Sequence, residues 1–199
     1  MDRTQELNEI VEQWNLLKHP FYLAWSAGTL PVPALQVYAR EYGAFIGTLP
    51  QAWLTLNDAA TAREEKEHAE FWKDFSQSLG ADPGSPAIEQ TISLAQAAER
   101  LFAAPATALG ALYAFEVQQP ATAHSKLEGL KKWYQVDKAG EKYFEVHSVN
   151  WHESEKILAQ INALPFDEQE QALEACAKMS EALWNALSGI HQNTCASQN

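Results

Sequence analysis

Apolar residues recur along most of this chain at alternating steps of three and four, the spacing that places them on one face of an α-helix. Prolines, glycines and short polar loops interrupt the pattern and limit each predicted helix. The predicted helices run over residues 7–17, 33–56 with a kink or a division at Pro50, 61–79, 85–102 with Ser85 as the N-cap, 105–130 with a bend at Pro120, 141–164, and 167–190. An aromatic-rich segment at 19–25 and a loop at 82–84 join some of them. No strand-like alternation of apolar and polar residues occurs, so the pattern predicts an all-α protein, one bundle of seven or eight helices.

Three of these helices carry a polar residue at a position where the pattern requires a buried one. Glu65 and His68 lie on the apolar face of their helix, and Glu116 and His147 do so in two other helices. An unpaired carboxylate or imidazole in an apolar core costs on the order of several kcal/mol. These four side chains therefore need partners inside the protein.

A shared metal ion would provide such a partner. Helical bundles that bind iron or manganese combine a Glu-x-x-His pair from one helix with carboxylates or imidazoles from others. Two histidines with one or two carboxylates suit a non-haem ferrous ion that activates dioxygen. We therefore expect Glu65, His68, Glu116 and His147 to bind ferrous iron. The alternative is that no metal binds, because His147 can be a hydrogen-bonded core residue and Glu116 can accept a hydrogen bond from a tyrosine.

Aromatic residues are expected around this site. Tyr38, Tyr42, Tyr113 and Trp151 lie on the apolar faces near the proposed ligands, where they would line a cavity and contact a bound cofactor or substrate. His152 lies on the opposite face of its helix, so the periodicity places it on the surface or at the rim.

Length and charge narrow the classes of function. The chain has 199 residues, with 14 Lys and Arg against 26 Asp and Glu, a formal net charge of -12. It therefore lacks the basic surface that binding to nucleic acid or to an anionic membrane requires. Two cysteines are too few for a disulfide framework, and the sequence shows neither a secretory signal nor a membrane span. We expect a soluble cytoplasmic protein with one domain over residues 1–191 and a polar tail over 192–199.

Three segments carry motifs of a known superfamily. They are HPFYLAW at 19–25 with YAREY at 38–42, AFEVQQP at 114–120 with KLEGL at 126–130, and YFEVH at 143–147. Together they cover nearly the whole chain in the right order and resemble the haem-oxygenase-like superfamily. That superfamily contains thiaminase II (TenA), the pyrroloquinoline-quinone synthase PqqC and the CADD-type iron-dependent oxygenases. The resemblance implies a compact helical bundle around a central cavity, commonly a homodimer, without a requirement for haem.

The resemblance to the CADD-type branch implies that His68, Glu116 and His147 are metal ligands. It also implies an iron-dependent oxidase or oxygenase of a small organic molecule, with a mononuclear or degenerate dinuclear site.

This chain departs from the CADD-type pattern at three positions. Thr61 replaces a Glu seven residues before the first His, and Trp151 and Ser154 replace an Asp and a His after the last one. A relative that makes terminal alkenes has its Glu three residues before the His, where this chain has Glu65.

A metal-free function on the same fold is the alternative. Glu41, Tyr42 and Glu181 resemble the pyrimidine-binding positions of the thiaminase branch, which implies catalytic roles for them. The nucleophilic cysteine of that branch is missing from the helix that contains Glu116, so thiamin hydrolysis by a thiolate is excluded. A PqqC-like function is ranked last, because the buried helix faces offer almost no Lys or Arg to a polyacidic substrate. A non-catalytic small-molecule binding protein is the remaining possibility.

Overall fold

The computed structural model describes residues 2–81 and 85–195, and over these residues the chain is helical without a strand. The expected loop at 82–84 and the last four residues of the expected tail lie outside the described residues. The helices are α1 (Thr4–Gln13), α2 (Pro20–Ala27), α3 (Val32–Ile46), α4 (Leu49–Thr55), α5 (Ala59–Ser78), α6 (Glu89–Leu101), α7 (Pro105–Glu116), α8 (Gln119–Gly129), α9 (Lys138–His147), α10 (His152–Ala163) and α11 (Phe166–Cys195), with short turns η1 (Leu16–Lys18) and η2 (Leu130–Tyr134). The predicted all-α class is confirmed.

Three of the helical stretches that the sequence predicts are interrupted. The break between α3 and α4 lies beside Pro50, where the sequence predicts a kink or a division. The break between α7 and α8 lies beside Pro120, where the sequence predicts only a bend. The break between α9 and α10 is a correction, because the sequence predicts one regular helix over 141–164. Ser148 Oγ donates to the Glu145 carbonyl (2.9 Å), and Asn150 Nδ2 donates to Glu153 Oε2 (2.7 Å). Such local side-chain bonds compete with the helical ladder.

Helix ends differ from the sequence prediction in three further places. The segment 19–25 belongs to a helix, α2, whose N-cap is His19: its Nδ1 accepts the Phe21 N–H at 3.1 Å. Helix α6 begins at Glu89, with no cap from Ser85, and the amides of the two residues before it, Ala87 and Ile88, donate to a carboxylate of α3. Helix α11 continues to Cys195, so residues 192–195 are helical rather than part of a tail.

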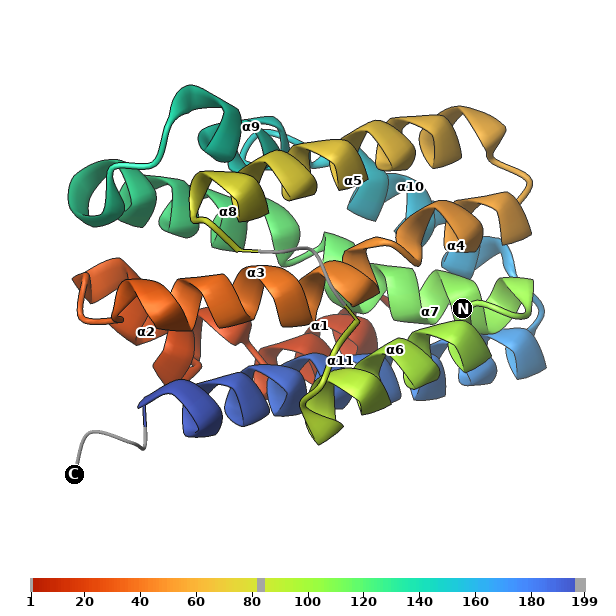
Figure 1. Ribbon diagram of the computed structural model, residues 1–199. Coiled ribbons are helices and arrows are strands. Elements are labelled where there is room, and N and C mark those ends of the chain that lie inside the picture. The colour runs from red at the N-terminus through yellow and green to blue at the C-terminus, as the bar shows by residue number, and fades with distance from the viewer. Residues whose placement is uncertain (1, 82–84, 196–199) are drawn as a thin grey trace.

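The longest helix, α11, extends along most of the bundle and packs against α7, α6, α3 and α1 (Figure 1). Gly110 permits the close approach of α7 to α11, since a Cβ at this position would lie 1.9 Å from the Ala172 carbonyl oxygen. On the other side of the bundle, α5 packs against α9 and α4, and α10 packs against α7. The polar residues of α5, α7, α9 and α10 are thereby directed into one region of the core.

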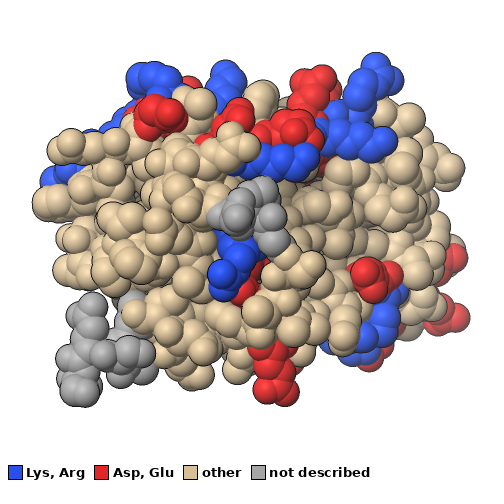
Figure 2. All heavy atoms as spheres, viewed as in Figure 1, with Lys and Arg blue, Asp and Glu red and all other residues tan. Residues whose placement is uncertain are grey.

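Among the described residues, no helix combines the length and the apolar character that crossing a membrane would need. On the face shown in Figure 2, Lys and Arg alternate with Asp and Glu instead of forming a broad basic surface.

Candidate metal centre

Five ionisable side chains meet in the core of the bundle. Glu65 and His68 come from α5, Glu116 from α7, His147 from α9 and Glu153 from α10, and each is at most 8% exposed. Donor atoms of Glu65, His68 and His147 all lie within 4.8 Å of one another, and so do donor atoms of Glu65, Glu116 and Glu153. The structure thus brings the four predicted ligands together, adds Glu153, and makes Glu65 common to both groups.

The two histidines are held in orientations that suit metal binding. His147 Nδ1 lies 2.7 Å from the Tyr143 carbonyl oxygen, so Nδ1 carries the proton and Nε2 keeps its lone pair. Burial, with a contribution from His68, lowers the pKa of His147 to about 3, which keeps its imidazole neutral. The His68 ring is 4.4 Å from the His147 ring, and its Nδ1 lies 3.0 Å from Glu65 Oε1. Burial lowers the pKa of His68, but this hydrogen bond and the charge of Glu65 raise it overall.

One oxygen of each of the three carboxylates lacks the partner that a buried oxygen requires. Glu65 Oε2, Glu116 Oε1 and Glu153 Oε1 are buried without a hydrogen-bond partner. Burial, followed by the charges of the neighbouring carboxylates, raises the pKa of Glu116 well above its usual value. Burial and the charge of Glu65 likewise raise the pKa of Glu153. Native proteins rarely leave such groups unsatisfied, and a divalent cation would compensate all three at once.

The donor set fits iron. Glu65, His68 and His147 form the two-histidine, one-carboxylate combination typical of non-haem ferrous sites. Donors that occupy adjacent positions around such an ion lie about 3 Å apart, as follows from bond lengths of about 2.1 Å. The 3.0 Å hydrogen bond between His68 Nδ1 and Glu65 Oε1 shows that these two side chains approach as closely as adjacent ligands do.

Aromatic rings enclose the cluster. The Tyr143 ring stacks on His147 at 4.1 Å, and Trp72 contacts the Tyr143 ring at 4.8 Å. Gln119 Nε2 donates to the Tyr143 hydroxyl at 2.9 Å and fixes the ring. This wall keeps bulk water from one side of the centre and strengthens electrostatic interactions within it.

A buried lysine lies among tyrosines beside this wall. Lys126 Nζ donates to the hydroxyls of Tyr22 (3.2 Å) and Tyr38 (3.3 Å), which are hydrogen-bonded to each other at 3.0 Å. The Tyr42 ring stacks on Tyr38 at 5.1 Å. Burial lowers the pKa of Lys126 to about 7. Lys126 corrects the expectation that the buried faces carry almost no basic residue.

Two predicted cavity residues lie elsewhere. Trp151 is 52% exposed, because it falls in the break between α9 and α10 instead of on a continuous buried face. Tyr113 is directed at α1, where its hydroxyl donates to Asn8 Oδ1 at 2.8 Å. His152 is exposed, as its periodicity predicts.

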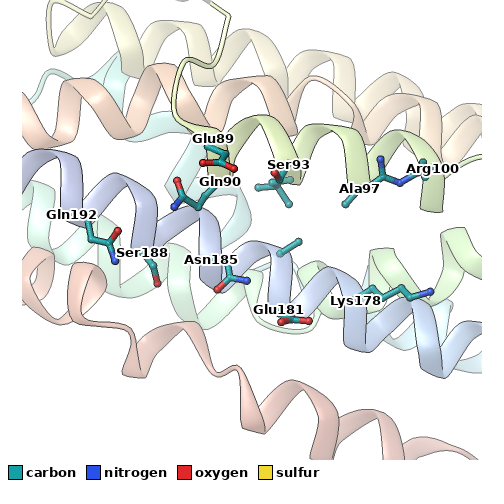
Figure 3. Close-up of a pocket in the computed structure, with 12 residues that line it drawn as sticks. Glu89, Gln90, Ser93, Ala97, Arg100, Lys178, Glu181, Asn185, Ser188 and Gln192 are labelled. Carbon is teal, nitrogen blue, oxygen red and sulfur yellow. The ribbon is translucent and has the colours of Figure 1, made fainter.

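The structure does not bring Glu41 and Glu181, the two residues predicted to act in a metal-free enzyme, to this centre. Both Glu41 oxygens are occupied: Oε2 accepts the N–H groups of Ala87 and Ile88 and the Thr91 hydroxyl, and Oε1 accepts from Arg40. Glu41 therefore closes the N-terminus of α6. Glu181 is exposed on α11, in a surface groove of about 580 Å³ between α6 and α11 (Figure 3).

Sequence reasoning missed Glu153 and Lys126. Glu153 is off the predicted apolar face, and no pattern in the sequence marks the break that turns it inward. The burial of Lys126 could have been predicted, since Lys126 shares a helix face with Ala123, Leu127 and Leu130.

Comparison with known proteins identifies the family. The model of a family described as iron-containing redox enzymes matches residues 51–185, a span that includes all five clustered side chains. The chain belongs to this family. Among relatives of this iron-containing redox enzyme, a 4-aminobenzoate synthase of Nitrosomonas europaea is 31% identical and covers 96% of this chain and 92% of its own length. A 4-aminobenzoate synthase of Chlamydia pneumoniae is 30% identical, with 94% of each chain covered.

Solved structures show the same fold. A domain of unknown function from Shewanella denitrificans with a heme oxygenase-like fold has a TM-score of 0.80 at 16% identity, covering 97% of this chain and 93% of its own. A TenA homologue from Pseudomonas syringae has a TM-score of 0.77 at 14% identity, covering 94% and 92%. The predicted haem-oxygenase-like bundle is confirmed.

Proposed function

We propose that this iron-containing redox enzyme is an iron-dependent oxidase that forms 4-aminobenzoate or a closely related aromatic amine. Ferrous iron would be held by Glu65, His68 and His147, with Glu116 close to the same Glu65. The observation that carries the proposal is the buried two-histidine, one-carboxylate group, whose Glu65 Oε2 has no protein partner. The product class is supported by the near full-length similarity to two proteins named 4-aminobenzoate synthase.

The bound iron would supply the one-electron chemistry needed to activate dioxygen. The protein supplies orientation, exclusion of water and proton transfer. The Tyr143 carbonyl holds the tautomer of His147, and the Trp72 and Tyr143 rings shield the centre. Lys126 Nζ, with a pKa of about 7, can take up or release a proton near neutral pH, while Tyr22 and Tyr38 stay neutral phenols because burial raises their pKa well above the usual value.

Growth complementation tests the proposal through the product, whatever the substrate is. The chain is expressed in a bacterium that cannot make 4-aminobenzoate, and growth is measured on iron-replete medium without that compound. We expect the wild type and the surface control His124→Ala to restore growth, and His147→Ala to fail at equal protein level. Equal growth with His147→Ala contradicts the metal site, whereas oxygen consumption by the iron-loaded protein without growth contradicts only the product class.

A metal-free enzyme based on Glu41 and Glu181 receives no support from the geometry, because the Glu41 oxygens are already bound and Glu181 is exposed. The homodimer implied by the resemblance stays a prediction. Sedimentation equilibrium of the purified protein would test it.

A further inference from the structure

Tyr143 holds the His147 side chain at two points. Its carbonyl oxygen lies 2.7 Å from His147 Nδ1, and its ring stacks on the imidazole with 4.1 Å between the ring centroids and 29° between the planes. Tyr143 precedes His147 by four residues in α9, so the two side chains lie one above the other on the same helix face. The direction of His147 Nε2, the atom left for a metal, therefore depends on where the Tyr143 side chain is held.

A hydrogen bond from α8 fixes the far end of the Tyr143 side chain. Gln119 Nε2 donates to the Tyr143 hydroxyl at 2.9 Å, and both residues are buried. Thr122 Oγ1 is a donor 3.4 Å from Gln119 Oε1, so the other end of the amide, Nε2, is the one that faces Tyr143. Trp72 contacts the Tyr143 ring at 4.8 Å and 84°, in an edge-on arrangement. The ring is thus held by Trp72 and by the Gln119 amide together.

Gln119 lies where two segments of the centre meet. It is the first residue of α8, three residues after Glu116, at which α7 ends. Helix α8 packs against α9, the helix of Tyr143 and His147. The hydrogen bond between Gln119 and Tyr143 therefore connects the segment that carries Glu116 to the helix that carries His147.

We infer that Gln119 is a positioning residue for the metal centre: through Tyr143 it holds the His147 imidazole in the orientation that a metal ion requires. This inference rests on the proposed function for the binding of metal by His147. Removal of a partner that orients a metal-binding histidine typically weakens metal binding roughly 10- to 100-fold. Gln119 acts through one further residue, so we expect its loss to weaken binding by roughly tenfold, the lower end of that range.

Cobalt binding tests the inference independently of turnover. The full chain is stripped with chelator and titrated with Co²⁺ alone, and the visible absorption of the bound ion gives both its dissociation constant and a signature of its ligand geometry. Gln119→Leu keeps the approximate size of the side chain but cannot donate, and Tyr143→Phe keeps the ring but cannot accept. We expect each variant to bind Co²⁺ roughly tenfold more weakly and to show an altered spectrum at saturating Co²⁺. The double variant should bind no more weakly than either single variant, because both changes remove the same hydrogen bond.

Gln118→Leu is the matched control. Gln118 is also buried, but its Oε1 accepts the Leu16 N–H at 2.8 Å and its Nε2 donates to the Ala114 carbonyl at 3.0 Å. Neither contact involves Tyr143. This variant should therefore lose stability in urea and still bind Co²⁺ with the affinity and the spectrum of the wild type.

The possible results separate this inference from the proposed function. No Co²⁺ binding by the wild type, or unchanged binding in His147→Ala, overturns the metal site and this inference with it. Binding that is lost in His147→Ala but unchanged in Gln119→Leu overturns this inference alone. So do single effects that multiply in the double variant, or equal weakening in Gln118→Leu. If Gln119→Leu does not fold, as judged by circular dichroism, Tyr143→Phe decides: Co²⁺ affinity and spectrum like those of the wild type overturn the inference.

Discussion

Replacing Lys126 with methionine should stabilise the metal-free protein, and more so at low pH. Methionine keeps most of the side-chain volume, and Tyr22 and Tyr38 keep the hydrogen bond between them. The pKa of Lys126 falls from 10.5 to about 7 on burial, a difference of roughly 5 kcal/mol in the free energy of holding the charge. Between these values the unfolded chain binds a proton that the folded chain does not, so the Lys126 contribution to stability rises with pH. The free-energy cost of burying the Lys126 ammonium is therefore largest below about pH 7 and decreases to zero towards pH 10.5.

Urea denaturation of chelator-treated protein at about pH 6 and about pH 9 measures this effect. From the lower to the higher pH, the unfolding free energy of the wild type should rise by roughly 2 to 3 kcal/mol more than that of Lys126→Met. The exposed residue Lys66 provides the control, since Lys66→Met should shift stability equally at both. A stability difference between wild type and Lys126→Met that is independent of pH would refute a buried, proton-releasing Lys126.

Three further predictions test the packing and the metal. Gly110→Ala should lower the unfolding free energy by about 1 to 3 kcal/mol, because the new Cβ would clash with the Ala172 carbonyl. The control Gly47→Ala should change it little in the same denaturation assay, since its Cβ would make only ordinary van der Waals contacts. Glu41→Ala should lower the unfolding free energy by about 1 to 3 kcal/mol, because it leaves the amides of Ala87 and Ile88, just before α6, without their partner. Elemental analysis should find the iron content of this variant unchanged, and a loss of iron would contradict the capping role. Chelation should lower the melting temperature, since metal at 100 times its dissociation constant contributes about 2.7 kcal/mol, and a melting curve that chelator does not move would contradict metal binding.

The sequence predicts the bundle well because its breaks are mostly encoded in single residues. Pro50 and Pro120 remove backbone donors and interrupt the predicted helices next to the observed breaks. The break between α9 and α10 has no proline or glycine. It depends on weak local bonds from Ser148 and Asn150 and on the packing of α10 against α7, so the apolar pattern alone favours a continuous helix.

In the site, too, the residues that follow a local sequence pattern could be predicted, and those that depend on how the chain turns could not. Glu65, His68, Glu116 and His147 could be found because each interrupts a regular apolar face. Glu153 could not, since its burial depends on how the chain turns after His147. The role of Glu41 could not be predicted either, because the amides that it binds lie just before α6, about 46 residues along the chain.

The most direct test of the central claim is the iron content of the purified protein after anaerobic reconstitution with ferrous ion, measured by elemental analysis. The geometry predicts at least one equivalent per wild-type chain, retained in His124→Ala and lost in His147→Ala. An iron content well below one equivalent in the wild type, or an unchanged content in His147→Ala, would contradict a metal centre built on Glu65, His68 and His147.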